Sequence, residues 1–156
     1  MRAEKRVWIA SPYFVPDESI IKALQLAAAR GVDVRILLPE KADHLLVWLA
    51  SFSYVPEVTE CGVKVYRYTQ GFLHQKVVLV DEYLGAVGTA NLDNRSLRLN
   101  FEITAIVHDS HFAEQVATML ERDFECSRDV SSMTFGEMSL LKQLGSKAAR
   151  LFSPTL

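Results

Sequence analysis

Short apolar runs, separated by polar segments that contain glycine or proline, predict alternating strands and helices along the chain. Runs rich in β-branched residues are typical of buried strands, whereas apolar residues that recur every three or four positions indicate amphipathic helices. The expected strands cover residues 7–10, 32–38, 63–68, 73–80, 84–89 and 101–107. This alternation predicts an α/β fold in the form of an α/β sandwich with a mixed sheet.

Four helices are expected between and after these strands. Asp17 is placed to cap a helix that runs to Arg30 and ends at Gly31. A second helix is expected over residues 43–54, ending before Pro56. The third has an apolar face, and the fourth, which runs to about residue 151, opens with the capping-box string 134–137 (Thr-Phe-Gly-Glu). The apolar face of the third helix comprises Phe112, Val116, Met119, Leu120 and Phe124.

Residues 45–54 are apolar on nearly every side, which a helix with one exposed face would not be. The favoured interpretation is that this helix packs into the core. The alternative is an acyl-chain wall or a membrane-facing patch, which an enzyme acting on lipids would need somewhere on its surface.

Composition fits one domain with a sizeable core, because the chain has 156 residues of which 49% are hydrophobic. A net charge of −2 argues against a nucleic-acid partner, which leaves a basic footprint. No apolar run approaches the roughly 20 residues of a membrane span. Cys61 and Cys126 lack the spacing of metal ligands, and we expect both to be reduced, buried thiols.

Candidate chemistry concentrates in residues 73–91. In a strand over 73–80, His74 and Lys76 point to the same face, because side chains alternate. Asp81 lies an odd number of residues from His74, so it belongs to the opposite face or to the following turn, where its carboxylate is expected to bond backbone amides. The returning strand brings Thr89 and Asn91 back alongside.

These side chains suit a phosphate group. A neutral imidazole such as that of His74 is a nucleophile and a proton carrier near pH 7, while Lys76, Thr89 and Asn91 can donate to phosphoryl oxygens. One ammonium contributes about 4 kcal/mol at 4 Å with an effective dielectric constant of 20, whereas enzymatic rate enhancements start at about 8 kcal/mol. Further cationic donors must therefore come from elsewhere. Arg95 could contact phosphate or brace the loop after Asn91, and Arg67 is expected at the surface near the site.

The string of residues 71–76 (Gly-Phe-Leu-His-Gln-Lys), followed by Asp81 and by residues 88–96 (Gly-Thr-Ala-Asn-Leu-Asp-Asn-Arg-Ser), resembles the signature of the phospholipase D superfamily. Residues 11–17, 95–102 and 150–154 are similar to stretches of the bacterial cardiolipin synthases. Thr89 stands where a serine is more usual, a change that keeps the hydroxyl. The resemblance covers nearly the whole chain.

This resemblance implies a two-step phosphotransfer through a phosphohistidine, without metal or cofactor. His74 would attack phosphorus, Lys76 and Asn91 would hold the oxygens, and Glu102 would orient His74 by accepting a hydrogen bond from its ring. The motif residue Asp81 completes the catalytic set by resemblance, although we expect its part to be mainly structural. Thr89 and Arg95 are the expected substrate-binding residues.

Active sites of the family contain two such motifs, whereas this chain has one, because His44, His108 and His111 lack a lysine two residues on. We therefore expect residues 1–156 to be a single phospholipase D-like domain, the second half of a duplicated catalytic unit whose N-terminal part is missing. Its partner would be that other half or a second copy of the chain. The parent protein is expected at the bacterial cell membrane, with this fragment soluble and its cysteines reduced.

Three functional classes remain open. The first is a phosphatidyltransferase that joins two phosphatidylglycerol molecules into cardiolipin and releases glycerol. The second is a phospholipase D or homodimeric nuclease that uses water as the acceptor. The third is a noncatalytic half that completes a partner domain. The acidic charge balance and the apolar helix favour the first over a nuclease, and the intact His74, Lys76 and Asn91 disfavour the third.

Overall fold

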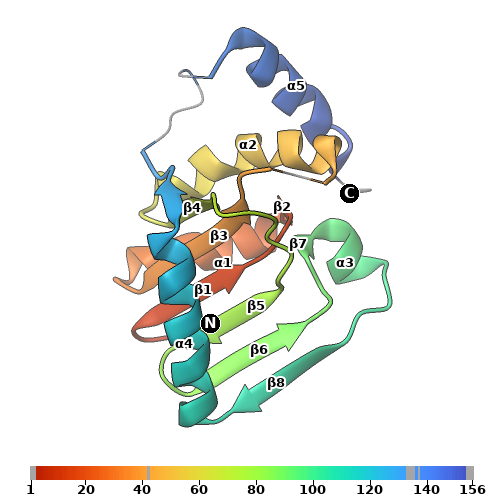
Figure 1. Ribbon diagram of the computed structural model, residues 1–156. Coiled ribbons are helices and arrows are strands. Elements are labelled where there is room, and N and C mark those ends of the chain that lie inside the picture. The colour runs from red at the N-terminus through yellow and green to blue at the C-terminus, as the bar shows by residue number, and fades with distance from the viewer. Residues whose placement is uncertain (1–2, 42, 133–135, 137, 154–156) are drawn as a thin grey trace.

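A seven-stranded mixed sheet forms the centre of the molecule in the computed structural model, which describes residues 3–41, 43–132, 136 and 138–153 (Figure 1). The strand order is β8-β6-β5-β1-β3-β4-β9. A second, two-stranded sheet pairs β2 with β7 in parallel. The strands are β1 (Arg6–Ala10), β2 (Phe14–Val15), β3 (Asp33–Pro39), β4 (Lys64–Tyr68), β5 (Val77–Val80), β6 (Leu84–Gly88), β7 (Leu92–Asp93), β8 (Thr104–His108) and β9 (Ser127–Asp129). The helices are α1 (Glu18–Ala29), α2 (Leu45–Thr59), α3 (Asn94–Arg98), α4 (Ser110–Glu125) and α5 (Leu140–Arg150).

The sheet has a parallel part and an antiparallel part that meet at β1. Strands β1, β3 and β4 are parallel, with Ile9 opposite Ile36 and Ile36 opposite Val65. Strand β5 runs antiparallel to β1, and β6 and β8 continue in antiparallel pairs, while β9 pairs antiparallel with β4 at the other edge. The predicted α/β sandwich with a mixed sheet is therefore confirmed.

Helices cover the two faces of the sheet unequally. Helices α1 and α2 lie against one face and share a core with β1, β3 and β4, while α4 crosses the other face and buries Trp8, Leu79 and Leu120. Helix α5 packs on α2, on its far side from the sheet (Figure 1). No helix in the described part of the chain combines the length and the apolar content that crossing a bilayer requires.

Helix α1 begins and ends as its sequence predicts. The Asp17 side chain accepts a hydrogen bond from the backbone N–H of Ile20, which satisfies one of the free donors of the first turn. Arg30 is the C-cap, and Gly31 follows with φ of 86°, a conformation that glycine adopts without strain.

Helix α2 is core, and it is longer than expected. The sheet lies on one side of it and α5 on the other, which explains why it is apolar nearly all round and confirms the favoured interpretation of residues 45–54. The prediction that it ends before Pro56 is wrong, because the helix continues to Thr59. Val55 and Val58, on either side of the proline, are fully buried, so packing outweighs the hydrogen bond that proline removes.

The last two helices differ from expectation in detail. In α4 the apolar face is present, but Met119 lies at its exposed margin. Helix α5 starts at Leu140, and Ser139 caps it by accepting from the N–H of Lys142. The expected capping box falls on Thr134 and Glu137, which lie outside the described residues.

Several elements and environments were not anticipated. The short elements β2, β7, α3 and β9 were not predicted. Arg67 is buried, not at the surface, and its guanidinium donates to the Pro39 carbonyl and the Ser51 hydroxyl. Cys61 and Cys126 are free thiols, but both are exposed, contrary to the expected burial.

Candidate active site

The segment that carries His74 and Lys76 is extended but precedes β5. The strand expected over residues 73–80 begins only at Val77. The predicted alternation nevertheless holds, because Leu73 and Val77 are buried beneath α4 and the amide of Gln75 donates to Asp123 Oδ2 on α4 at 2.6 Å. His74 and Lys76, the intervening residues, therefore point away from α4.

The returning strand β6 places Asn91 beside Lys76. The N–H of Gly88 donates to the Lys76 carbonyl at 3.1 Å, which extends the β5–β6 pairing to the motif. A Cβ at Gly88 would lie 2.4 Å from the Ile103 carbonyl oxygen, so only glycine fits this close approach to the strand beyond. The residues that follow Gly88, including Asn91, are thereby held beside the start of β5.

A cavity of about 130 Å³ lies at this point, on the face of the sheet opposite α4. Its polar wall includes Lys76 and Asn91, and its apolar lining includes Ile9, Val78, Ala86 and Leu97. The buried Asn91 Oδ1 has no hydrogen-bond partner among the described residues. Buried polar atoms are nearly always paired in folded proteins, so this acceptor is free to take a hydrogen bond from a ligand or a water.

Glu102 does not make the expected bond to His74. One of its carboxylate oxygens accepts from the Thr89 hydroxyl and the other from the Asn100 side-chain amide, and no hydrogen bond from His74 appears in the part of the chain that the structure describes. The bonds from Thr89 and Asn100 hold the pKa of Glu102 below its usual value, and the positive charge of Lys76 adds to this. Glu102 is thus fixed by its neighbours, and its negative charge raises the pKa of Lys76.

The two expected substrate-binding residues are tied to this carboxylate. The Thr89 hydroxyl donates to Glu102 and accepts from the Ile103 N–H at 3.0 Å, so it braces Glu102 instead of facing the cavity freely. Arg95, on α3, is exposed, and its Nε donates to Asn100 Oδ1 at 3.4 Å.

Aromatic and charged residues that the sequence analysis missed surround His74. Phe72 stacks on the His74 ring at 5.3 Å, and Tyr13 meets it edge-on at 6.5 Å. Tyr13 also meets His44 edge-on at 6.3 Å and donates its hydroxyl to Asp43 Oδ2 at 2.9 Å. Partial burial, followed by the bond to Asp43, raises the pKa of Tyr13 to about 12, so the phenol stays protonated near neutral pH.

These residues were recognisable from topology. Tyr13 follows the carboxyl end of β1, and Asp43 and His44 follow the carboxyl end of β3. Parallel strands direct their carboxyl ends to the same edge of the sheet, where α/β proteins bind ligands.

Lys76 sits among three carboxylates. Partial burial lowers the pKa of its ammonium group, while the negative charges of Asp43, Glu102 and Asp93 act in the opposite direction. Burial also tends to raise the pKa of Asp43, but the bond from Tyr13 and the backbone N–H groups of Asp43 and His44 outweigh it and hold that pKa below its usual value. The site therefore combines an imidazole and an ammonium with fixed anionic groups.

Asp81 is not part of this arrangement, and its place in the expected catalytic set stays a prediction that this geometry argues against. It lies at the opposite end of β5 from His74, is buried, and has a φ of 53°. Its carboxylate accepts from the backbone N–H groups of Glu4, Lys5 and Arg6. This confirms the expectation that Asp81 bonds backbone amides, and it fastens the start of β1 to the β5–β6 turn.

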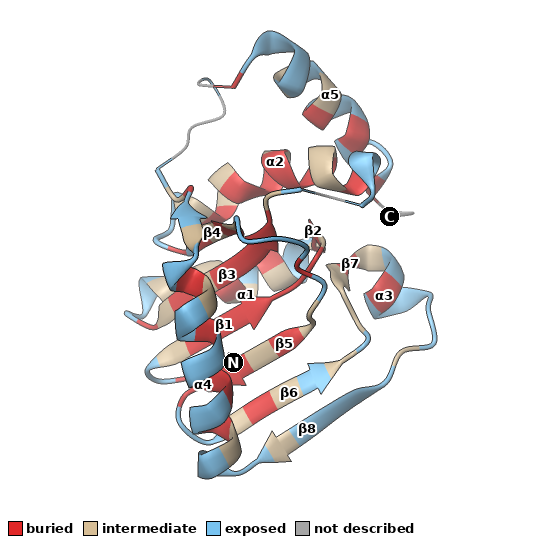
Figure 2. Ribbon diagram, in the orientation of Figure 1, coloured by how far each residue is buried: buried red, intermediate tan, exposed pale blue. Residues whose placement is uncertain are grey.

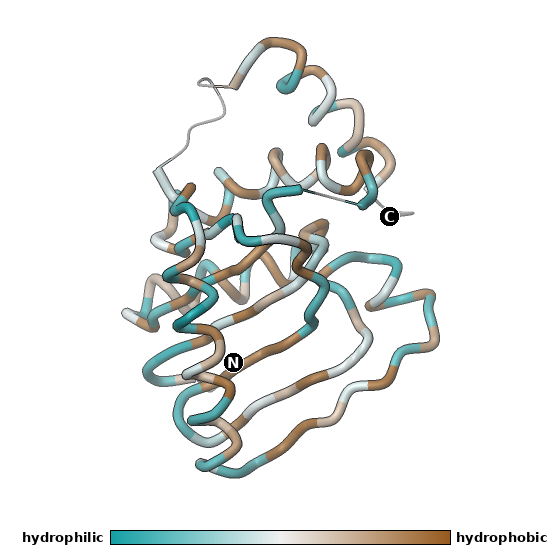
Figure 3. The backbone as a smooth tube through the Cα atoms, viewed as in Figure 1, coloured by the Kyte–Doolittle hydropathy of each residue, from teal (hydrophilic) through white to brown (hydrophobic). Residues whose placement is uncertain are grey.

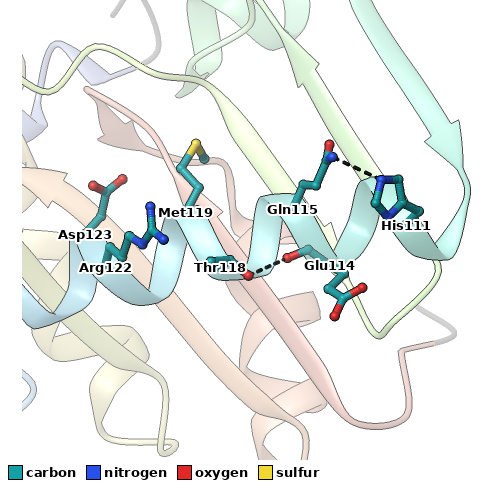
Figure 4. Close-up of a pocket in the computed structure, with 7 residues that line it drawn as sticks. All are labelled: His111, Glu114, Gln115, Thr118, Met119, Arg122 and Asp123. Atoms are coloured by element: carbon teal, nitrogen blue, oxygen red, sulfur yellow. Dashed lines mark hydrogen bonds between the residues drawn. The ribbon is translucent and has the colours of Figure 1, made fainter.

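A larger hollow, of about 430 Å³, lies elsewhere, and Figure 4 shows its lining. All of the lining residues belong to α4: His111, Glu114, Gln115, Thr118, Met119, Arg122 and Asp123. A single helix provides no opposing wall, so this open trough is a poor binding site. No group of three or more potential metal-ligating side chains occurs within the described ranges.

Comparison with known proteins links this geometry to one family. Residues 1–124 match a family model described as "Cardiolipin synthase, PLD-like domain". Cardiolipin synthase A of Pseudomonas putida is 54% identical over 154 residues, and that of Pseudomonas syringae is also 54% identical over 154 residues. In both cases the match covers 99% of this chain and 32% of the relative. The chain thus spans about a third of the length of the curated relatives it matches.

Two solved structures have the same fold at low sequence identity. A phospholipase D family member, Nuc, from Salmonella typhimurium matches with a TM-score of 0.73 and 22% identity, over 82% of this chain and 83% of that one. Phosphatidylserine synthase from Haemophilus influenzae matches with a TM-score of 0.78 and 18% identity, over 99% of this chain and 42% of that one. These likenesses establish the phospholipase D-like fold independently of the sequence match.

Proposed function

Because this chain belongs to the phospholipase D-like domain family of the cardiolipin synthases, we propose that it is a catalytic domain for phosphatidyl transfer. The substrate is a glycerol-headed phospholipid, phosphatidylglycerol, and the products are cardiolipin and glycerol. The observation that carries the proposal is the meeting of Lys76 and Asn91 at one cavity, with His74 exposed two residues before Lys76 on the segment that leads into β5. The 54% identity to cardiolipin synthase A over nearly the whole chain supports the choice of substrate.

The reaction proceeds in two displacements at phosphorus. A ring nitrogen of His74 forms a bond to phosphorus, the bond to the glycerol head group breaks, and the departing oxygen takes up a proton. The glycerol hydroxyl of a second phosphatidylglycerol then loses its proton and attacks phosphorus, and the nitrogen–phosphorus bond breaks. Lys76 and Asn91 donate to the nonbridging oxygens, where negative charge accumulates in both transition states.

A proton donor for the leaving oxygen has to come from outside this motif. We propose that residues 1–156 form the second half of a duplicated catalytic unit, and that another phospholipase D-like unit supplies a second histidine and lysine. The surface near the site is suited to such a partner, because it exposes large apolar side chains on and beside the edge strand β8. These are Leu97, Leu99, Phe101, Ile103 and Ile106.

The test uses phosphorus-labelled phosphatidylglycerol with three samples: the chain alone, the chain mixed with the remaining part of a full-length relative, and the full-length relative. We expect cardiolipin and free glycerol from the second and third samples, and rapid quenching of the second should trap an acid-labile, base-stable adduct on the peptide that contains His74. The chain alone is expected to form neither product.

Each alternative predicts a different outcome. Phosphatidic acid as the main product would make the protein a hydrolase. Activity of the mixture that survives replacement of His74 in this chain would make the domain a noncatalytic half. Cardiolipin formation by the chain alone, with light scattering that shows a dimer, would replace the duplicated unit by a homodimer.

A further inference from the structure

The imidazole of His74 has aromatic neighbours but no carboxylate bonded to its ring among the described residues. Phe72 stacks on it at 5.3 Å with the ring planes 14° apart, and Tyr13 meets it edge-on at 6.5 Å. Glu102, the acceptor that the sequence resemblance implied, is engaged with Thr89 and Asn100. Stabilisation of a positive charge on this imidazole therefore requires a different anion.

Asp43 is a second carboxylate at this edge of the sheet. The Tyr13 hydroxyl donates to Asp43 Oδ2 at 2.9 Å, and the ring of the same tyrosine meets His74 edge-on. Burial raises the pKa of Asp43, but the bond from Tyr13, two backbone N–H groups and the charge of His74 outweigh it. The carboxylate is therefore ionised near neutral pH, and it lies close enough to His74 for their charges to interact.

Side chains from β4 and α2 fix the connection between β3 and α2, which carries Asp43. The buried guanidinium of Arg67 donates to the Pro39 carbonyl at 3.1 Å. The indole N–H of Trp48 donates to the Glu40 carbonyl at 3.2 Å. Figure 3 shows the described residues of this connection as hydrophilic, in teal, where it leaves β3. The fold therefore places a polar segment, and the Asp43 carboxylate with it, at the site.

The negative charge of Asp43 is unfavourable for binding an anionic substrate, because it repels a phosphodiester. It is favourable for the reaction of His74. When one ring nitrogen bonds to phosphorus while the other keeps its proton, the imidazole becomes positively charged. A fixed anion beside the ring stabilises this charge as it develops, so it lowers the barrier to bond formation.

We propose that Asp43, held by Tyr13, is a positioning residue that acts through His74. Its fixed carboxylate stabilises the positive charge that the ring acquires as the nitrogen–phosphorus bond forms and the bond from phosphorus to the departing group breaks. The inference rests on the proposed function only in taking His74 as the nucleophile. Asp43 then serves the imidazole, while Glu102 serves Lys76.

The test uses phosphoramidate, an inorganic phosphoryl donor, so it needs neither a lipid nor a partner and is separate from the test of the proposed function. A ring nitrogen bonds to phosphorus, the bond from phosphorus to the amino group breaks, and ammonia leaves. The phosphorylated ring then loses its N–H proton to solvent. The folded chain is treated near neutral pH, and phosphate is measured over time on its separated peptides.

The peptide that contains His74 should gain phosphate about threefold more slowly in Asp43→Asn than in the wild type, because the lost charge faces an exposed ring. The peptide that contains His108 and His111, two exposed histidines on β8 and α4, is the internal control and should react equally in both proteins.

Three further variants separate the charge of Asp43 from a structural role. Asp43→Glu keeps the charge and should react at close to the wild-type rate, and Tyr13→Phe, which frees the carboxylate, should fall between the wild type and Asp43→Asn. Glu40→Gln is the matched control, because it removes a carboxylate that is paired with Arg128 on the same connection. It should react as the wild type does, and circular dichroism checks that each variant is folded.

In an active assembly with labelled phosphatidylglycerol, Asp43→Asn should slow adduct formation about tenfold and leave KM unchanged, because the carboxylate acts on the ring and not on the substrate. Equal phosphoramidate rates at His74 in the wild type and Asp43→Asn would overturn the proposal, as would an equal loss in Asp43→Glu or no reaction at His74. The expected phosphoramidate rates without any lipid product would overturn the proposed function and leave the role of Asp43 in place.

Discussion

The two parts of the central sheet differ in how far they are buried. In β3, within the parallel part, the side chains of Val34, Ile36 and Leu38 are almost completely inaccessible. In β8, at the antiparallel edge, four of five residues are exposed, Ile106 among them at 68%. Figure 2 shows this gradient as red strands that give way to tan and then pale blue from β1 to β8.

The candidate active site lies where the two parts of the sheet meet. Its cavity is lined by Ile9 and Ala10 of β1, by residues of β5 and β6, and by Thr104 at the start of β8. The parallel part therefore supplies most of the buried core, while the antiparallel part contributes Lys76 and Asn91 to the candidate site and exposes apolar side chains along β8. The following predictions test this division.

Replacement of His74 by Asn should have the largest effect, and on activity alone. The nucleophile is lost, so cardiolipin formation by an active assembly that contains this chain should fall by at least about 10³-fold. Because His74 is exposed, the free energy of unfolding of the His74→Asn variant should differ from that of the wild type by less than about 0.5 kcal/mol. His108→Asn, an exposed histidine on β8, is the control. Comparable activity in the two variants would remove His74 from the mechanism.

Replacement of Ile36 by Ala should have the largest effect on stability. Ile36 is fully buried in β3, and loss of its side chain leaves a cavity that costs about 2–5 kcal/mol in urea unfolding. The matched change Ile106→Ala on β8 should cost less than about 0.5 kcal/mol in the isolated chain. Similar losses of unfolding free energy in the two variants would show that Ile106 on β8 is already buried in solution. That result would contradict the proposed difference between the buried parallel strands and the exposed edge strand.

Glu102→Gln should lower turnover by about tenfold and barely change stability, because Glu102 acts on the site by its charge. Its carboxylate raises the pKa of Lys76, so removal of that charge lowers this pKa further. The alkaline limb of the rate profile, where Lys76 loses its proton, should therefore move to lower pH. Glu114→Gln on the outer side of α4 is the control. An unchanged pH profile would show that the charge of Glu102 does not influence the ionisation of Lys76.

Asp81→Asn should affect stability but not turnover. Burial raises the pKa of Asp81, but the N–H donors of Arg6, Lys5 and Glu4 outweigh it and hold the pKa below its ordinary value. A lowered pKa contributes stability above the unfolded-state value of about 3.9, and this stability is lost as the pH falls through the folded-state pKa.

At pH 7 the Asp81→Asn variant should therefore be less stable by about 1–2 kcal/mol, and the difference should shrink below about pH 4. Asn tolerates the positive φ at this position, so the backbone need not change. Glu82→Gln, at the exposed neighbouring position, is the control. A loss of turnover without a loss of stability would return Asp81 to the catalytic set.

Local patterns predicted much of the fold and part of the geometry of the candidate site. Alternation placed His74 and Lys76 on one face, and capping signals located α1, because both depend on residues close in sequence. The course of α2 through Pro56 depends on burial of Val58 against distant elements, which propensity does not register. Asp43 and Tyr13 meet only because β1 and β3 are neighbours, so their approach to His74 follows from topology.

The same alternation sets what kinds of genetic change the motif can accept. Gln75 is held by Asp123 on one side of the sheet, while His74 and Lys76 face the other side. A substitution at one of these positions changes the contacts on one side of the sheet only. An insertion or deletion of a single residue between Leu73 and Val77 would move the imidazole beneath α4 and a core side chain into the cavity. Chain length across these residues should thus be under stronger constraint than the identity of Gln75, whereas length variation is tolerable in loops that only connect elements.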